Sequence, residues 1–228
     1  MRVRAKVAAV LACSVLPLTS AAAATRPADP TLLTVSETGK LTLVNLRSGR
    51  VRQFMRAYQA TWSPDGRRIV FVGRGERGLG DLFVINSDGS HLHRLTHDDS
   101  VEEHDPVWSS DGNRLAYFAQ RQALFQDDLI VLSLSTGVSA SIARGRPLKE
   151  QLEWSPDGRK LAFATSSSAT RGIRVVDATT GQPVDTWLGN NYPLWSPDGS
   201  RVRLDRERTS KTHGREAGWI GRARRLPR

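Results

Sequence analysis

The sequence predicts an all-β fold: a β-propeller of four-stranded antiparallel blades, with about four blades present in 228 residues. Three observations predict it. A five-residue motif recurs four times, short apolar runs follow it, and no segment has sustained helical periodicity. The tryptophans of the motif are 46, 46 and 41 residues apart, which is close to the length of one four-stranded blade, about 40 to 45 residues.

The motif has the form Trp-Ser-Pro-Asp-Gly, with Ser110 replacing the proline in one copy. Proline presets φ at the second position of a type I turn, aspartate caps its own backbone at the third, and glycine takes the left-handed fourth. We therefore expect hairpin turns in which the following residues have structural roles: Trp62, Asp65, Gly66, Trp108, Asp111, Gly112, Trp154, Asp157, Gly158, Trp195, Asp198 and Gly199.

The strands of each blade follow from the apolar pattern around the turns. After the turns come runs that are apolar on both faces, as expected for sheets packed between neighbouring sheets. These runs are 69–72, 115–118 and 161–164. A further strand precedes each of four glycine turns, and another follows it. The preceding strands are 41–44, 82–85, 129–132 and 173–176, and the following ones are 51–54, 92–95, 139–143 and 184–187.

The blade count leaves two alternatives. Three whole units span about 58–96, 105–143 and 152–188, residues 32–54 supply three strands of another, and Trp195 begins a fifth. The chain closes as a four-bladed ring if the strand ending at Trp195 completes the first blade, or it is a truncated propeller. The apolar pattern is lost at about residue 203, where Arg203 and Asp205 replace apolar residues.

The repeat resembles those of TolB and related tricorn-like proteins over about residues 31–202. The resemblance is carried by the Trp-Ser-Pro-Asp-Gly turn, the apolar strand, the glycine turn and a closing Arg94-Leu95-Thr96. It implies a six-bladed propeller. In TolB the propeller engages an envelope lipoprotein, and a separate N-terminal domain, which has no counterpart in this sequence, engages the rest of the Tol machinery.

The two termini differ from the repeats. Residues 1–24 have the cationic start, apolar stretch and small-residue cleavage site of a secretory signal, and they contain the single cysteine, Cys13. We expect an exported protein, periplasmic or extracellular, with propeller repeats over 25–204 and a basic, disordered tail over 205–228. A solvated tail is the favoured interpretation, and binding to acidic lipid or nucleic acid is the alternative.

The formal charge of +10 does not describe the repeats. Of 33 cations, three lie in residues 1–6 and ten in 200–228, and of 23 anions three lie in 200–228, so 20 of each remain between. We therefore expect no nucleic-acid partner for the body. We also expect no transmembrane segment in the mature chain, because the apolar stretch of the signal is shorter than a membrane span.

Candidate metal ligands concentrate in one connection between blades. They are His91, His93, His97, Asp98 and His104. His91 and His93 share one face of a strand, and imidazoles with carboxylates suit a divalent ion. A polar connection without metal is the favoured interpretation. Gly73-x-Gly75-x-x-Gly78 matches a dinucleotide fingerprint, but no helix follows it, which favours a hairpin loop.

We expect no enzyme and no cofactor. Neither a Gly-x-Ser-x-Gly elbow nor a His-Glu-x-x-His helix occurs in the sequence. The expected function is a non-catalytic exported scaffold whose blade loops or central funnel bind a protein partner. The alternatives are the propeller of a prolyl-oligopeptidase-type hydrolase, or a sugar-binding or metal-binding propeller.

Overall fold

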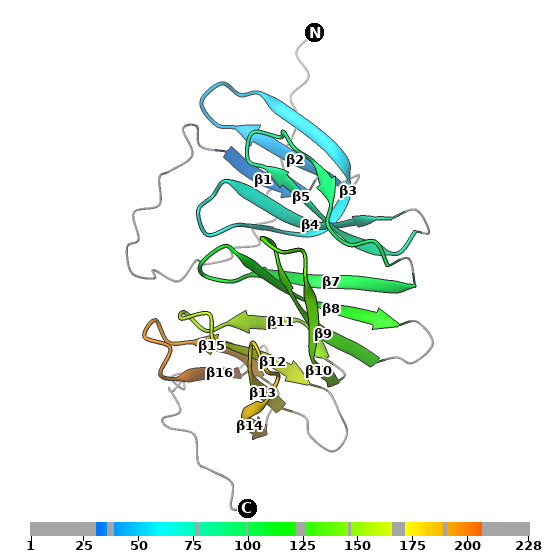
Figure 1. The fold of residues 1–228 in the computed structure, drawn as a ribbon. Coiled ribbons are helices and arrows are strands. Elements are labelled where there is room, and N and C mark those ends of the chain that lie inside the picture. The colour runs from blue at the N-terminus through cyan, green and yellow to red at the C-terminus, as the bar shows by residue number, and fades with distance from the viewer. Residues whose placement is uncertain are drawn as a thin grey trace, which may run out of the picture.

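The computed structural model describes residues 31–35, 39–75, 78–98, 100–121, 126–145, 147–165, 172–188 and 191–206. The expected signal segment and all but the first two residues of the expected tail lie outside these ranges. The described residues form strands and turns without a helix (Figure 1). The prediction of an all-β fold is therefore confirmed.

The strands follow one another along the chain in the predicted order. Within the described residues they are β1 (Thr31–Val35), β2 (Lys40–Asn45), β3 (Val51–Trp62), β4 (Arg68–Arg74), β5 (Gly80–Asn86), β6 (His93–Arg94), β7 (Val101–Trp108), β8 (Arg114–Arg121), β9 (Gln126–Ser133), β10 (Ser139–Gly145), β11 (Pro147–Trp154), β12 (Lys160–Thr165), β13 (Gly172–Asp177), β14 (Pro183–Leu188), β15 (Asn191–Trp195) and β16 (Val202–Arg206).

Strand pairing divides these elements into blades. Strands β7 to β10 form one four-stranded antiparallel sheet and β11 to β14 another. The long strand β3 belongs to two blades, because its first half pairs with β2 and its second half with β4. The first blade therefore has three strands, β1, β2 and the start of β3, and the second has the end of β3, β4, β5 and β6. The prediction of four-stranded antiparallel blades is confirmed, although β7 and β11 begin at Val101 and Pro147, before the predicted starts of their units.

The ring is not closed within the described residues. In the part of the chain that the structure describes, β15 pairs with β16 and not with β1, so these strands do not close a four-bladed ring. Strand β16 also continues to Arg206, past the point where the apolar pattern ends. The pattern did not predict this length because strand pairing joins backbone groups, which every residue except proline carries in full.

The core lies between the blades. In β4, Val70 and Val72 pack into a cluster with the third blade, whereas Ile69 and Phe71 pack into a cluster with the first. Successive side chains of a strand point to opposite faces, so one strand supplies two cores. Strands β8 and β12 repeat the arrangement. This is why the runs after the repeat turns are apolar at every position.

The first strands of successive blades lie beside one another. Strand β3 contacts β7, β7 contacts β11, and β11 contacts β15. In β3 and β7 a β-bulge interrupts the pairing a few residues before the tryptophan, and in β11 the register shifts by a longer irregular segment. Bulges re-aim side chains and are common next to functional sites, so this row of strands and the turns that follow it position the polar groups described next.

Candidate binding surface: the repeat turns and the blade junctions

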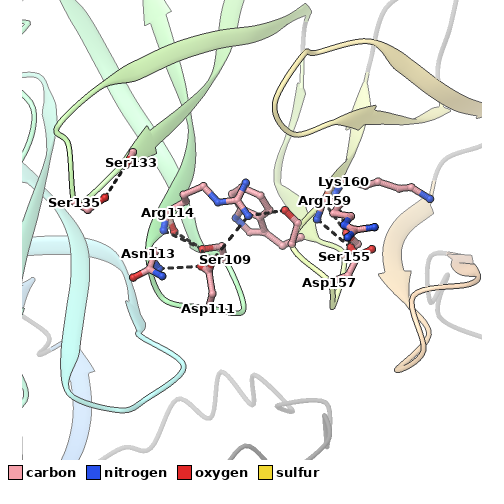
Figure 2. A network of polar contacts seen from close by, with 12 residues as sticks. Ser109, Asp111, Asn113, Arg114, Ser133, Ser135, Ser155, Asp157, Arg159 and Lys160 are labelled. Carbon is pink, nitrogen blue, oxygen red and sulfur yellow. Dashed lines mark hydrogen bonds and ion pairs between the residues drawn. The ribbon is translucent and has the colours of Figure 1, made fainter.

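A serine hydroxyl closes each repeat turn, as Figure 2 shows for two of them. Ser109 Oγ donates to Asp111 Oδ1 over 2.5 Å and accepts from the backbone N–H of Arg114 over 3.0 Å. Asp111 Oδ1 also accepts from the N–H of Asn113 over 2.9 Å. The turns at Ser63, Ser155 and Ser196 repeat all three bonds. The four turns thus share one geometry.

The glycine of the turn has the same backbone conformation, and the aspartate makes the same bonds, in all four copies. The four glycines have φ between +66° and +69°, a left-handed conformation that favours glycine. At Asp111 burial raises the pKa, but hydrogen bonds from Ser109 and Asn113 and the charge of Arg114 outweigh it and lower the pKa. At the exposed Asp198, bonds from Ser196 and Ser200 lower the pKa to about 2. These carboxylates are therefore ionised at neutral pH and engaged in the turns.

An arginine links each of the first two turns to the next blade. Arg68 Nη2 donates to the carbonyl oxygen of Gly112 over 2.9 Å, and its guanidinium lies 5.0 Å from the ring centre of Trp108. Arg114 makes the same pair of contacts with Gly158, at 2.7 Å, and Trp154, at 4.7 Å. A guanidinium over an indole face is attracted by the ring quadrupole, so one side chain both caps the tryptophan and ties two turns together.

Two of the repeat tryptophans donate hydrogen bonds to the preceding blade. Trp108 Nε1 donates to the carbonyl of Thr61 over 3.3 Å, and Trp154 Nε1 to that of Val107 over 3.2 Å. At the next junction Trp195 Nε1 is buried without a hydrogen-bond partner among the described residues. There the backbone N–H of Trp195 donates to Glu153 Oε2 over 3.2 Å, and burial raises the pKa of Glu153 to about 7.

The bulges of β3 and β7 bring two polar residues together. Gln59 and Asp105 both lie three residues before a repeat tryptophan and have φ of 56° and 53°. Gln59 Nε2 donates to Asp105 Oδ1 over 2.6 Å, and the Asp105 backbone N–H donates to Gln59 Oε1 over 2.9 Å. A left-handed φ is unfavourable at residues other than glycine. The two reciprocal hydrogen bonds stabilise this backbone conformation at both residues and join the second blade to the third.

His104 lies beside this pair and between two carboxylates. Its Nδ1 is 2.9 Å from Asp105 Oδ2, and its Nε2 is 3.7 Å from Asp127 Oδ2. Burial lowers the pKa of His104, but Asp105 and Asp127 outweigh burial and raise the pKa to about 9. The imidazolium is therefore charged at neutral pH. Within the described residues it is held as a structural cation, with its ring against Phe118.

A second buried network lies between the second and third blades. Arg94 Nε pairs with Asp81 Oδ2 over 2.9 Å. Thr96 Oγ1 donates to Glu103 Oε2 over 2.8 Å and accepts from the N–H of Leu82 over 2.9 Å. Burial raises the pKa of Glu103 to about 7, against the bond from Thr96. The closing Arg94-Leu95-Thr96 of the repeat thus supplies groups that satisfy buried carboxylates.

The candidate metal ligands do not converge. His91 and His93 lie on or next to β6, where their Nδ1 atoms contact Ser90 and the carbonyl of His91 respectively. His104 lies in the network with Asp127, and His97 and Asp98 are exposed. Among the residues that the structure describes, no group of three or more His, Cys, Asp or Glu side chains is placed to hold a metal ion.

The glycine-rich stretch forms the turn between β4 and β5. The Gly75 N–H donates to the carbonyl of Leu79 over 2.9 Å, and Gly80 begins the next strand. The hairpin interpretation is therefore confirmed. Within the described ranges the structure contains no helix with the length and apolar character of a membrane span.

Two groups of functional residues were not predicted from the sequence. One group is the serine after each tryptophan and the basic residue six positions after that tryptophan. Both were visible in the repeat, because all four copies have them, the basic residues being Arg68, Arg114, Lys160 and Arg201. The Gln59–Asp105 pair left no such signal, because the position three before the tryptophan is glutamine in two copies, aspartate in one and tyrosine in one. Such a pair is found only when the blades are placed beside one another.

Neither a family model nor a curated protein matches the chain. Solved structures do. The putative TolB from Agrobacterium tumefaciens is 22% identical with a TM-score of 0.60, over 76% of this chain and 65% of that one. An oligogalacturonate lyase in complex with manganese is 17% identical with a TM-score of 0.55, over 75% of this chain and 52% of that one.

The tricorn protease is 15% identical with a TM-score of 0.60, over 76% of this chain and 18% of that one. The chain thus spans 65% of the TolB structure and smaller shares of the other two. Proteins named as a lyase and as a protease share the fold with TolB, so function has to be argued from residues and not from architecture. The chain has the β-propeller fold of the TolB-like and tricorn-like proteins.

Proposed function

We propose that the protein is an exported, non-catalytic scaffold that binds a protein partner on the face formed by its repeat turns. The observation that carries the proposal is that the hydrogen-bonded frame of the repeat turn is the same in every copy, whereas one exposed residue on that frame varies. Four turns share one hydrogen-bond geometry. The exposed residue after the glycine nevertheless varies: it is arginine in two copies, Arg67 and Arg159, and Asn113 or Ser200 in the others.

Rigidity of the frame favours binding. Serine and aspartate close each turn, and Arg68 and Arg114 tie consecutive turns together. A surface that is already ordered loses little conformational entropy on association, and arginine is enriched among the residues that dominate protein interfaces. Export is supported by the features of residues 1–24. The likeness to TolB supports a scaffold, because the resemblance implies a propeller that engages another protein.

Site-specific photo-crosslinking in cells tests the proposal. A photoreactive amino acid at Arg67 or at Arg159 should give one crosslinked partner. The same residue at Thr186, which is exposed on β14, should give none. With the purified partner, Arg67→Ala and Arg159→Ala should each weaken binding about tenfold or more, as expected for hot-spot residues. Crosslinking from Thr186 alone, or unchanged affinity in both variants, would contradict a partner on the turn face.

A second candidate is the substrate-gating propeller of a peptidase-type enzyme. The fold shared with the tricorn protease favours it. The genomic sequence immediately downstream distinguishes the two candidates. Further Trp-Ser-Pro-Asp-Gly repeats alone support the scaffold, whereas a region with Gly-x-Ser-x-Gly supports the enzyme.

A further inference from the structure

Two clefts lie at corresponding places in the first two blade junctions. The first, of about 290 Å³, is lined by Thr31, Leu43, Asn45, Arg50, Arg52, Ser87 and Asp88. The second, of about 110 Å³, is lined by Arg68, Val84, Asn86, His91, His93, Leu95 and Leu134. Strand register shows the correspondence. Thr31 pairs with Asn45 as Arg68 does with Asn86, and Arg52 pairs with Leu43 as His93 does with Val84.

The difference in volume has a physical cause in one position. In the second junction Arg68 extends across to the next blade and covers Trp108. In the first junction the corresponding residue is Thr31, whose side chain is too short to do so. Trp62 is accordingly only partly buried, whereas the other three repeat tryptophans are buried. The first cleft is therefore larger because no arginine occupies it, whereas Arg68 partly fills the corresponding cleft of the second junction.

Two guanidinium groups line this open cleft. The strand position that holds Arg52 in the first blade holds His93, Ala140 and Asp185 in the following blades, as their pairing partners show. Arg50 lies two residues before Arg52, is exposed, and has no hydrogen bond or ion pair from its side chain within the described residues. The positive lining is thus particular to this junction.

The surroundings place Arg52 and offer further donors. Arg52 Nη1 donates to the carbonyl of Asp88, and a side chain at Gly89 would collide with the guanidinium, so glycine lets it lie along the turn. Asn45 Oδ1 accepts bonds from the backbone N–H groups of Arg47 and Ser48 and from the Ser48 hydroxyl, which leaves the Asn45 amide as a donor. Two guanidiniums and an amide together suit a tetrahedral oxyanion.

The charge balance at the cleft favours an anion. Asp88 is the single carboxylate in the lining, and its Oδ1 accepts from the N–H and the hydroxyl of Ser90. Residues 39–64 contain five cations, Lys40, Arg47, Arg50, Arg52 and Arg56, and no aspartate or glutamate. The zero net charge of the repeats therefore conceals a cationic first blade, whose positive potential attracts anions.

We propose that the cleft between the first two blades binds the phosphate group of a small phosphomonoester, with Arg50 and Arg52 as its ligands. The volume of the cleft is far above the roughly 10–15 Å³ of cavity space that one water molecule needs. A phosphate with a short organic group therefore fits, and Leu43 offers an apolar wall to that group. The cleft adjoins the turn face, because the backbone N–H of Ser87 donates to the carbonyl of Arg67, but its proposed phosphate ligands, Arg50 and Arg52, lie outside the repeat turns. The phosphate proposal does not depend on the proposed partner.

Titration calorimetry on the full chain tests the proposal, with glycerol 3-phosphate, inorganic phosphate and neutral glycerol at constant ionic strength. Both phosphates should bind and glycerol should not. Arg50→Ala and Arg52→Ala should each weaken binding about tenfold or more, as the loss of charged hydrogen bonds predicts. Arg56→Ala removes the same charge from the same strand outside the cleft and should leave the affinity unchanged.

The variant Thr31→Arg distinguishes phosphate binding inside the cleft from non-specific attraction to a positively charged surface. It places an arginine where the second junction has Arg68, so it should abolish phosphate binding although it adds a positive charge. Arg52→Lys keeps the charge but not the planar fork and should weaken binding several-fold. Circular dichroism of each variant shows that the fold is retained. Equal weakening by Arg56→Ala and Arg52→Ala, or tighter binding by Thr31→Arg, overturns the proposal.

A phospholipid headgroup carries the same chemistry as a soluble phosphomonoester. Sedimentation with phosphatidylcholine vesicles, with and without phosphatidic acid, distinguishes the sources. Binding of glycerol 3-phosphate supports a soluble ligand. Binding only to vesicles with phosphatidic acid, lost in Arg52→Ala, supports a lipid. Absence of both overturns the proposal.

Discussion

At the scale of single residues, the polar groups that matter are those held between two blades. His104 shows the effect most clearly, because its imidazole is largely buried between Asp105 and Asp127. A cation in that position is stabilised by both carboxylates, and removal of its proton would leave two buried anions facing a neutral ring. The charge state of one histidine is thereby coupled to the junction between the second and third blades.

This coupling predicts a pH dependence of stability. The pKa of His104 is raised in the folded protein to about 9 from 6.5. Its contribution to stability is therefore complete below about pH 6.5 and is lost as the pH rises through about 9. We expect the difference in unfolding free energy between the wild type and His104→Gln to fall by on the order of 1–3 kcal/mol from pH 6 to pH 10. Urea denaturation at each pH measures this difference.

In the difference between the wild type and His104→Gln, the contributions of the other titrating groups cancel. Glu103 and Glu153 also have pKa values raised to about 7 by burial, but both proteins contain them. Parallel curves of unfolding free energy against pH would show that His104 has no raised pKa in the folded state.

Sequence was informative about residues wherever the chemistry is local. The positions of Pro64, Asp65 and Gly66 in the turn follow from φ preferences and short-range hydrogen bonds, and the structure places them so. Gln59 and Asp105 are 46 residues apart and bond only because two bulges align. No local preference encodes such a contact, so it was not predicted.

At the scale of elements, each blade junction depends on the side chain of the first residue in the second strand of the blade, which is β4, β8 or β12. Arg68 and Arg114 bridge to the next turn, but the third copy has Lys160 at this position. Lysine lacks the planar fork that both stacks on an indole and donates to a carbonyl. The junction between the fourth blade and β15 is accordingly built differently, with Glu153 bonded to the backbone of Trp195.

Lys160→Arg is therefore expected to stabilise the protein. The new guanidinium would lie over Trp195 and donate to the carbonyl of Gly199, by analogy with the preceding junctions. The expected gain in the free energy of unfolding is about 0.5–1 kcal/mol, measured by urea denaturation. The reciprocal variant Arg114→Lys should lose a comparable amount. A loss of stability in Lys160→Arg would mean that this junction does not follow the geometry of the others.

The strands themselves were well predicted, for a physical reason. Strands β4, β8 and β12 are covered on both faces, so selection for burial acts on every residue and leaves a continuous apolar run. The end of β16 was not predicted, because Arg203 and Asp205 break that run while the backbone still pairs with β15. An apolar pattern records burial, and pairing can extend beyond it.

At the scale of the whole molecule, stability should be distributed by strand position and not by blade. Strands β4, β8 and β12 have partners on both edges and cores on both faces. Hydrogen exchange should be slowest in these three strands and fastest in the outermost strands β6, β10 and β14. Protection that instead changes blade by blade along the chain would indicate blades that open independently.

The junctions between blades are also directional. Arg68 and Arg114 reach forward to the next turn, and Trp108 and Trp154 reach back to the preceding blade. A head-to-tail contact of this kind is not self-complementary, so it does not fix how many units follow one another. Gene duplication can therefore lengthen or shorten such an array by one repeat while every remaining junction keeps its chemistry. Proteins descended from a common repeat can accordingly differ in blade number without any change in the rules that join their blades.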